Sequence, residues 1–221
     1  NAADLLTLAN DTNDYNKRFI LTADIDLDPN LPGREIFTSS VFETAFTGIF
    51  DGDGHIISNL IIDTNGVKTN SLGFFRNLVG QVNNLILKNA DINCGPDSSY
   101  IGLLTGYNDG DINNCHLTGN ISVARHSYNI GGLVGENWGY INDCCVAGTV
   151  KYYGNISSGI GGLVGNNFNI ISNCFSSVYI TGKEGSWDIG GLVGKNGGSI
   201  NNSYSTVNIN EEQEAFQVGG L

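Results

Sequence analysis

The chain has 221 residues, of which 22 are acidic and 10 basic, and its net charge is −12. This acidity argues against nucleic acid or an anionic membrane surface as a partner, and no apolar run reaches the length of about 18 residues that inserts into a membrane. Thirty-one glycines without a Gly-X-Y period exclude collagen, and 40% hydrophobic residues exclude a disordered tail.

Residues 1–46 differ from the rest and are predicted to form an N-terminal cap. Residues 2–9 carry helix formers at helical spacing, and the polar run 10–14 ends this short helix. Ile25 and Leu27 then alternate with polar residues, as in a half-buried strand. Its outer face carries the aspartates Asp24, Asp26 and Asp28. A repeat rod needs an atypical first unit to cover its end, which is the role expected for this region.

Residues 47–221 are organised by a phrase that recurs at a nearly fixed interval. It reads Ile-Gly-Gly-Leu-Val-Gly from Ile130, Ile160 and Ile189, and restarts at Val218, in steps of 30, 29 and 29 residues. Degraded copies start at Ile101, Leu72 and Thr47. Such a period is the signature of a solenoid. Because the sequence begins with Asn and stops inside this phrase, we read it as a segment of a longer protein.

Aligning the copies predicts which side chains face inward. One column is always apolar and is expected in the core: Phe50, Phe75, Leu104, Leu133, Leu163, Leu192 and Leu221. The next position tolerates charge and is expected to face solvent: Asp51, Arg76, Thr105, Val134, Val164 and Val193. A glycine precedes the apolar column by two residues in all seven copies, which indicates either close backbone approach or a positive φ.

A second segment, Ile-x-Asn-Cys, follows the phrase by about ten residues. Its Asn column is expected to bend the backbone and to stack amides between turns. A third apolar position follows at Ile121, Val150, Ile180 and Ile209. Three short strands per turn predict an all-β fold, a single-stranded parallel β-helix of about seven rungs with 29 or 30 residues each, right-handed by default.

The phrase Gly-Gly-Leu-Val-Gly, followed by Ile-x-Asn-Cys and Ser/Thr-rich alternation, resembles the GLUG repeat of bacterial surface and secreted proteins, including adhesin-like proteins and immunoglobulin A metallopeptidases. The resemblance covers residues 47–221 and is strongest from Ile101 onward. In the metallopeptidases the chemistry belongs to another domain with a zinc-binding His-Glu-x-x-His, and no histidine here stands in that motif. The resemblance implies a bacterial protein that is secreted or held at the cell surface.

The five cysteines allow two interpretations. Cys115, Cys144 and Cys174 share a column with Leu60, Leu85 and Ser203, so they are expected to be buried thiols. Stacked neighbours come within disulfide range, but in-register parallel strands place their Cβ atoms side by side, which favours free thiols over disulfides. Cys145 is expected to point outward and Cys94 to lie in a loop, where either can meet an outside partner.

Carboxylates are the best candidates for a binding site. Asp24, Asp26 and Asp28 line one strand face, and Asp51 and Asp53 lie in an acidic turn, where oxygen ligands suit a structural calcium ion. A solvated strand face and an ordinary turn explain the same residues, since neither matches the EF-hand calcium loop. No other cofactor is expected. A serine or cysteine nucleophile needs a positioned histidine, and the repeat gives no reason to expect one.

Two functions remain open. The first is a non-catalytic extracellular rod, structural or adhesive, which presents an Asn/Ser/Thr-rich surface to protein or glycan and associates end to end. The second is a carbohydrate-active module that binds or cleaves an extracellular polysaccharide, by analogy with other β-helices. The second also rests on aromatic residues expected to face a ligand: Tyr128, Trp138, Tyr140, Tyr152, Tyr153 and Trp187. The lack of a catalytic constellation favours the first function, which is not enzymatic.

Overall fold

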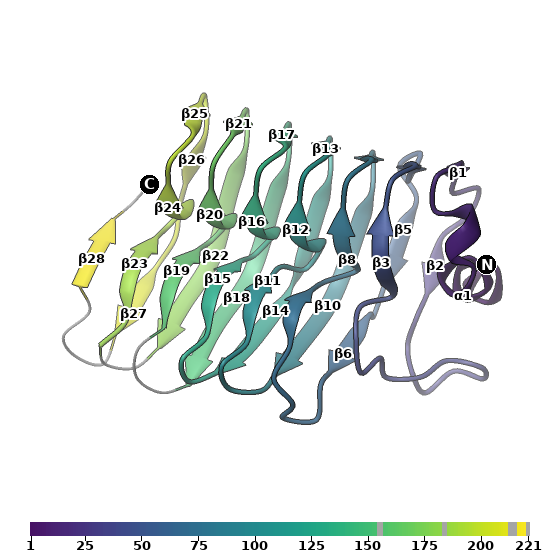
Figure 1. The fold of residues 1–221 in the computed structure, drawn as a ribbon, viewed down its shortest axis with the longest axis horizontal. Helices are drawn as coiled ribbons and strands as arrows, with labels where there is room; N and C mark the ends of the chain where they lie inside the picture. Colours follow the sequence, from purple (N-terminus) through teal and green to yellow (C-terminus); the bar gives the residue numbers. More distant parts are fainter. Residues whose placement is uncertain (154–156, 183–184, 212–215, 220–221) are drawn as a thin grey trace.

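A computed structural model, which describes residues 1–153, 157–182, 185–211 and 216–219, shows a rod of stacked parallel strands with a helix at its N-terminal end (Figure 1). The helix α1 (Ala2–Asn10) is followed by a short 3-10 helix, η1 (Thr12–Asp14). Asn1 caps α1, because its side chain accepts hydrogen bonds from the N–H groups of Ala3 and Asp4. The predicted helix in the N-terminal region is confirmed.

The strands form four parallel sheets that run the length of the rod. Sheet A contains β1 (Arg18–Ile20), β4 (Ile49–Asp51), β9 (Gln81–Asn83), β13 (Asp111–Asn113), β17 (Tyr140–Asn142), β21 (Ile170–Ser172) and β25 (Ser199–Asn201). Sheet B contains β2 (Ile25–Asp26), β5 (Ile56–Ser58), β6 (Ile61–Asp63), β10 (Ile86–Cys94), β14 (His116–Ala124), β18 (Cys145–Tyr153), β22 (Phe175–Gly182), β26 (Tyr204–Ser205) and β27 (Ile209–Glu211).

Sheets C and D complete each turn. Sheet C contains β3 (Phe42–Phe46), β8 (Phe75–Leu78), β12 (Thr105–Asn108), β16 (Val134–Asn137), β20 (Val164–Asn167) and β24 (Val193–Asn196). Sheet D contains β7 (Asn70–Leu72), β11 (Ser99–Ile101), β15 (Tyr128–Gly131), β19 (Ser158–Gly161), β23 (Trp187–Gly190) and β28 (Phe216–Gly219). The parallel β-helix is confirmed. Residues before 47 contribute α1 and also β1, β2 and β3, which pair with later turns.

Each turn has four strands, so the prediction of three was wrong. The reason is that the repeated phrase spans a corner: β15 ends at Gly131, β16 begins at Val134, and Gly132 and Leu133 form the bend between them. The corner also breaks strand alternation, so Leu133 and Val134 both face inward and are fully buried. The position after the apolar column was expected to face solvent. It is buried from Thr105 onward.

The core residues predicted within the described ranges lie inside the rod, at 0 or 1% exposure: Phe50, Phe75, Leu104, Leu133, Leu163, Leu192, Cys115, Cys144 and Cys174. Leu221, the last predicted member of the apolar column, lies outside the described residues. The predicted columns are confirmed for Leu104, Leu133, Leu163 and Leu192 and for the three cysteines, but not for the first copies of the phrase. Phe50 pairs with Val82 in sheet A, so the copy at Thr47 is a false match. The strand stacked on Phe75 is instead β3, through Phe42. An apolar residue two positions after a glycine occurs at more than one corner of the coil. The sequence alignment therefore matched Phe50 to the wrong corner.

Backbone geometry explains why the Asn column and the Gly column recur in the repeats. The Asn column adopts a left-handed conformation, with φ between 48° and 59° at Asn59, Asn84, Asn114, Asp143, Asn173 and Asn202, so the predicted bend is confirmed. The glycines of the phrase are explained by close approach instead. A Cβ at Gly102 would lie 2.5 Å from the carbonyl oxygen of Leu133 in the next turn.

Candidate functional site

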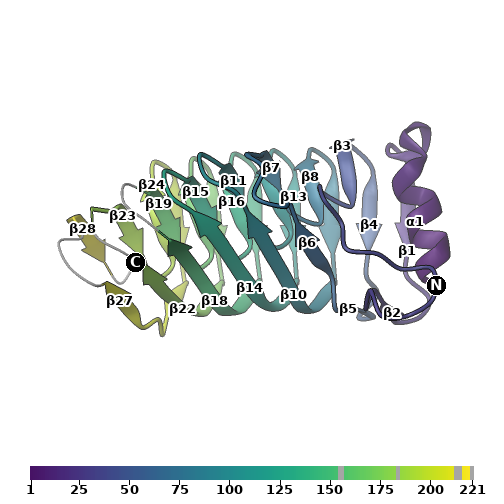
Figure 2. The same cartoon turned by 90° about the horizontal axis from the view of Figure 1, so that it is seen from below.

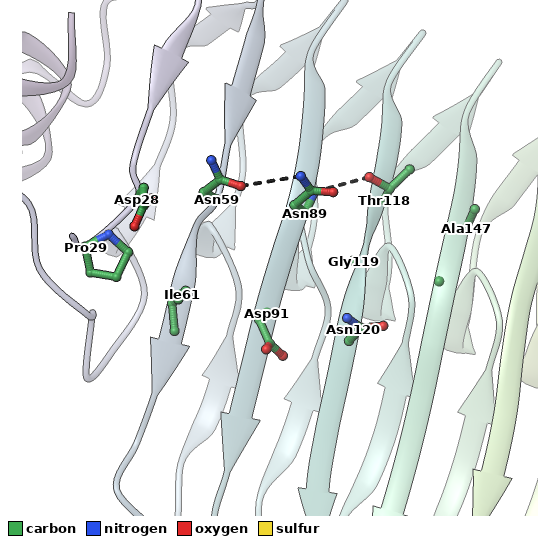
Figure 3. Close-up of a pocket in the computed structure, with 11 residues that line it drawn as sticks. Asp28, Pro29, Asn59, Ile61, Asn89, Asp91, Thr118, Gly119, Asn120 and Ala147 are labelled. Carbon is green, nitrogen blue, oxygen red and sulfur yellow. Dashed lines mark hydrogen bonds between the residues drawn. The ribbon is translucent and has the colours of Figure 1, made fainter. Parts of the chain in front are cut away.

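An open groove crosses the strands of sheet B (Figure 3). It encloses about 520 Å³. Figure 2 shows that β10, β14 and β18 lie side by side, so a ligand in the groove would run along the rod across successive turns. Its lining residues are Asp28, Pro29, Asn59, Ile61, Asn89, Asp91, Thr118, Gly119, Asn120, Ala147 and Gly148.

The groove forms because sheet B bends along one line. Asn59 separates β5 from β6, and Asn89 has a φ of 53° where the register between β10 and β14 slips. The floor continues through Gly119 and Gly148, which have no side chains to fill it. Gly148 has a φ of 137°, a conformation that favours glycine. Bends at the same place in successive turns therefore produce a continuous trough.

Two rows of polar side chains border the trough (Figure 3). In one row, Asn89 Nδ2 donates to Asn59 Oδ1 at 3.4 Å, and the Asn89 N–H donates to Thr118 Oγ1 at 3.2 Å. The other row contains Asp91 and Asn120. Amides, a hydroxyl and a carboxylate on a spacing of about 4.8 Å per turn offer repeated donors and acceptors. Such a lining suits a hydroxyl-rich or cationic ligand better than an apolar one.

Asp91 is the electrostatically unusual group of the groove. Desolvation by its surroundings and the nearby charge of Asp63 raise the pKa of its carboxyl. No described residue donates a hydrogen bond to this carboxylate. In contrast, Asp26 accepts a hydrogen bond from Asn59 Nδ2 at 2.9 Å, which lowers the pKa of Asp26. Asp91 therefore has unused acceptor capacity that faces the trough.

The aspartates predicted as calcium ligands make cross-strand contacts. Asp24 accepts from the Ile56 N–H at 3.0 Å and contacts His55 Nδ1 at 3.1 Å, and these bonds lower its pKa. Asp51 accepts from Asn84 Nδ2 at 2.9 Å, and also from the N–H of Asp53 at 3.1 Å. Asp28 lies at one end of the groove. Within the described ranges, no three or more His, Cys, Asp or Glu side chains are grouped to hold a metal ion.

Five of the six predicted ligand-facing aromatics are exposed, and one is not. The exposed ones are Tyr128, Trp138, Tyr140, Tyr153 and Trp187. Tyr152 is 1% exposed, so its prediction was wrong. Strand alternation in β18 turns it inward and its neighbour Tyr153 outward.

Trp138 belongs to an aromatic ledge that the sequence did not reveal. It stacks on Phe168 with ring centroids 4.2 Å apart, at the turn between sheets C and A. Its Nε1 donates to the carboxylate of Glu136 at 2.9 Å, and Asn129 Nδ2 donates to the same carboxylate at 2.7 Å. This ledge lies on a different edge of the rod from the groove in sheet B. Exposed stacked rings beside a carboxylate can pack on the apolar face of a sugar ring.

Sequence reasoning also missed a buried amide ladder and misplaced one cysteine. Asn108, Asn137 and Asn167 are fully buried and bond to one another through the rod. Their spacing of 29 and 30 residues was the available signal. Cys94 was expected in a loop, but it ends β10 and is buried, which raises the pKa of its thiol to about 12. The alternation of β10 continues to Cys94 and turns it inward.

All five cysteines are free thiols. Cys145, which was expected to point outward, is half-buried, and its sulfur lies 2.9 Å from His116 Nδ1. A cysteine with a positioned histidine was not expected. The pairing arises because both residues directly follow a cysteine of the core column, Cys115 and Cys144, and are therefore stacked in register.

Comparison with known proteins finds a known repeat motif in two turns of the rod. Residues 97–122 and 185–210 each match the GLUG motif, and each match covers about one turn of the rod. The chain is also 35% identical over 130 residues to halomucin of Haloquadratum walsbyi (strain DSM 16790 / HBSQ001). That similarity covers 54% of this chain, which spans about 1% of the length of halomucin. The resemblance to GLUG-repeat proteins is confirmed, since two of the turns are GLUG motifs.

A solved structure shares the fold. It is that of a Bacteroides ovatus protein provisionally named an immunoglobulin A1 protease, and it matches with a TM-score of 0.54 over 92% of this chain and 77% of that one. The two sequences are 19% identical, so the likeness concerns the fold alone. No helix within the described residues has the length and apolar character needed to cross a bilayer.

Proposed function

We propose that this chain is a non-catalytic GLUG-repeat rod of a secreted or cell-surface protein, and that its sheet-B groove holds an extended, hydroxyl-rich ligand such as a glycan. The observation that carries the proposal is the groove itself. It runs along the rod axis, and successive turns contribute Asn59, Asn89 and Thr118 to one border. Several weak and equivalent contacts to a repeating ligand add up to useful avidity.

Two further observations support a surface role. The GLUG motif recurs here as a structural repeat, and the chain is similar to a protein named halomucin. The acidity of the chain keeps it soluble and away from anionic membranes. The stacked rings of Trp138 and Phe168 offer a second, independent surface for sugar rings.

The test is a glycan array probed with the purified chain, with and without calcium. Asn120→Trp places a bulky ring on the groove wall and is expected to weaken binding by about tenfold or more, which corresponds to at least about 1.4 kcal/mol. Ser122→Trp is the matched control, because Ser122 is the next outward residue of the same strand, β14, and lies outside the groove. The control is expected to bind like the wild type.

Two results would contradict the groove as the site. The first is equal binding by the wild type and Asn120→Trp. The second is a loss of binding in Trp138→Ala with the groove intact, which would assign the ligand to the aromatic ledge. Dependence on calcium that disappears in Asp91→Asn would extend the proposal to a cation bridging the carboxylate and the ligand.

Cleavage of a polysaccharide is the alternative, and one observation favours it. Desolvation and the charge of Asp63 raise the pKa of the Asp91 carboxyl, and the general acid of a glycoside hydrolase is also a carboxyl group with a raised pKa. Our proposal predicts no release of reducing ends from any glycan that binds. Turnover that Asp91→Asn abolishes without unfolding the rod would replace the non-catalytic proposal with a hydrolase.

End-to-end association of these rods is a separate proposal. In the described part of the chain the last strand of each parallel sheet is paired along one edge, and the other edge of such a strand can accept another strand. Light scattering over a range of concentrations tests it. A mass that stays that of one chain at every concentration would rule it out.

A further inference from the structure

The outer face of sheet B carries a thiol and an imidazole side by side. His116 and Cys145 are register partners in β14 and β18, and both point outward because Leu117 and Val146, their neighbours, are buried. The Cys145 sulfur lies 2.9 Å from Nδ1 of His116. When Nδ1 carries no proton, it can accept a hydrogen bond from the thiol at this distance.

Cys145 differs from the cysteines of the core in its hydrogen-bond partner. Each thiol of the core column Cys115, Cys144 and Cys174 donates to a backbone carbonyl, as in Cys144 to Asn142 at 3.2 Å and Cys174 to Ser172 at 3.1 Å. A carbonyl oxygen cannot take the proton, whereas a neutral imidazole can. Cys145 is also the one cysteine of the five that is not buried. The Cys145 thiol is therefore accessible to a reagent and also has a base, His116, beside it.

A small pocket lies over this pair. It encloses about 140 Å³, and its walls include Ile86, Lys88 and Phe175. Phe175 continues the outward row beyond Cys145 and packs on Tyr204 with ring centroids 4.7 Å apart. The walls are mainly apolar, so the pocket accepts a small uncharged group rather than a protein surface. The thiol lies within reach of such a group.

We propose that Cys145 and His116 form a covalent modification site, which reacts with small disulfides to give a mixed disulfide at Cys145. The Cys145 thiol passes its proton to His116 Nδ1, and the sulfur attacks one sulfur of R–S–S–R′. The new Cys145–S–S–R bond forms as the R–S–S–R′ bond breaks, and the leaving R′–S⁻ takes the proton from His116. No further oxidant is needed, and the site reacts once per chain rather than turning over.

The surroundings of Cys145 explain why the histidine is required. Burial, and then the nearby Cys174, raise the pKa of the Cys145 thiol. The resting group is therefore a thiol at neutral pH, and attack needs proton removal by His116. Lys88 on β10 is the other titratable group that lines this pocket, and Tyr204 on β26 packs on its wall residue Phe175, while β22 presents Phe175 and Ser177, which do not titrate.

The experiment treats the native chain with 2,2′-dithiodipyridine and follows release of 2-thiopyridone. One equivalent is expected per chain, located at Cys145 by peptide mass mapping, and none from Cys145→Ser. His116→Gln is expected to slow the reaction at neutral pH by at least about tenfold, because glutamine cannot accept the proton. His126→Gln is the matched control, since His126 is exposed, lies beyond the opposite end of β14 from His116, and pairs with Asp97.

The pH profile separates a base from a merely structural histidine. Because His116 accepts the proton, the wild-type chain is expected to react readily at neutral pH. The His116→Gln rate is expected to keep rising with pH, since only the thiolate then reacts. The proposal is overturned if His116→Gln reacts at the same rate as the wild type and the His126→Gln control. It is also overturned if the label appears on a core cysteine while Cys145 stays free. Thermal unfolding of each variant confirms that the rod is intact.

Discussion

Removing one amide from the buried ladder should cost far more than removing the same amide from its end. Asn137 is fully buried, accepts from Asn108 Nδ2 at 2.7 Å, and donates to Asn167 Oδ1 at 2.7 Å and to the Gly139 carbonyl at 3.0 Å. Asn137→Ala breaks all three bonds. Asn196, by contrast, is exposed at the other end of the ladder, where water can replace what is lost.

The size of the stability loss depends on which hydrogen-bond partners of Asn137 keep another bond after the substitution. Asn108 Nδ2 keeps a bond to the Gly110 carbonyl at 3.2 Å, and Asn167 Oδ1 keeps the Asn169 N–H at 3.4 Å. Each lost bond contributes about 1 kcal/mol, and a buried polar group left without a partner costs about 1–3 kcal/mol. We therefore expect Asn137→Ala to lower the free energy of unfolding by about 3 kcal/mol. For Asn196→Ala we expect about 1 kcal/mol or less.

Equilibrium unfolding in urea measures both variants against the wild type. Asn137→Leu separates hydrogen bonding from packing, because it keeps most of the side-chain volume and removes the polar groups. We expect it to remain less stable than Asn196→Ala. If Asn137→Ala and Asn196→Ala are equally stable, the ladder contributes nothing beyond surface amides and the reasoning is wrong. Hydrogen exchange locates the effect if the turns of the rod unfold separately.

Three further predictions test the core, the thiols and the groove. Leu163→Ala should cost about 2–5 kcal/mol in urea unfolding, whereas Leu31→Ala, at an exposed loop position, should stay within about 0.5 kcal/mol of the wild type. Iodoacetamide without denaturant should label Cys145 and none of the other four cysteines, and rapid labelling of Cys144 would place its column on the outside. Folding raises the pKa of Asp91, so its charge opposes folding above the folded-state pKa, and below the unfolded-state pKa the effect vanishes. Asp91→Asn should therefore stabilise the ligand-free chain at neutral pH and make no difference below about pH 4, and a stability difference that does not change with pH would contradict this.

Local signals in the sequence were sufficient for the fold class. A parallel β-helix buries the same face in every turn. The recurrence of Leu104, Leu133 and Leu163 at the length of one turn therefore indicates that the turns are stacked. The left-handed bends were equally readable, because Asn at positions such as Asn114 and Asn173 is one of the few residues that adopts a positive φ easily. The N-terminal helix followed from its own spacing and stop signal.

The register at the start of the rod was not readable. The copy at Thr47 resembles the repeated phrase in sequence, yet its Phe50 pairs in sheet A and not at the corner that the phrase forms elsewhere. The reason is that a glycine followed by an apolar residue suits several corners of the coil. Burial next to a corner was also hidden, since Val134 follows a bend that the two-residue alternation of a strand does not describe. For the same reason the phrase was assigned one strand where the rod has two.

The sequence alone therefore determined what each turn repeats: its length, its inward apolar positions and its bends, all of which are local requirements of the backbone. Only the tertiary structure decided which side chains of different turns meet. The groove needs the bends at Asn59 and Asn89 to line up across sheet B, and the contact of His116 with Cys145 needs β14 and β18 to stack in register. Such contacts join residues about thirty positions apart, so they depend on the exact count of residues in every turn between them, which loops and bulges alter without changing the repeated pattern.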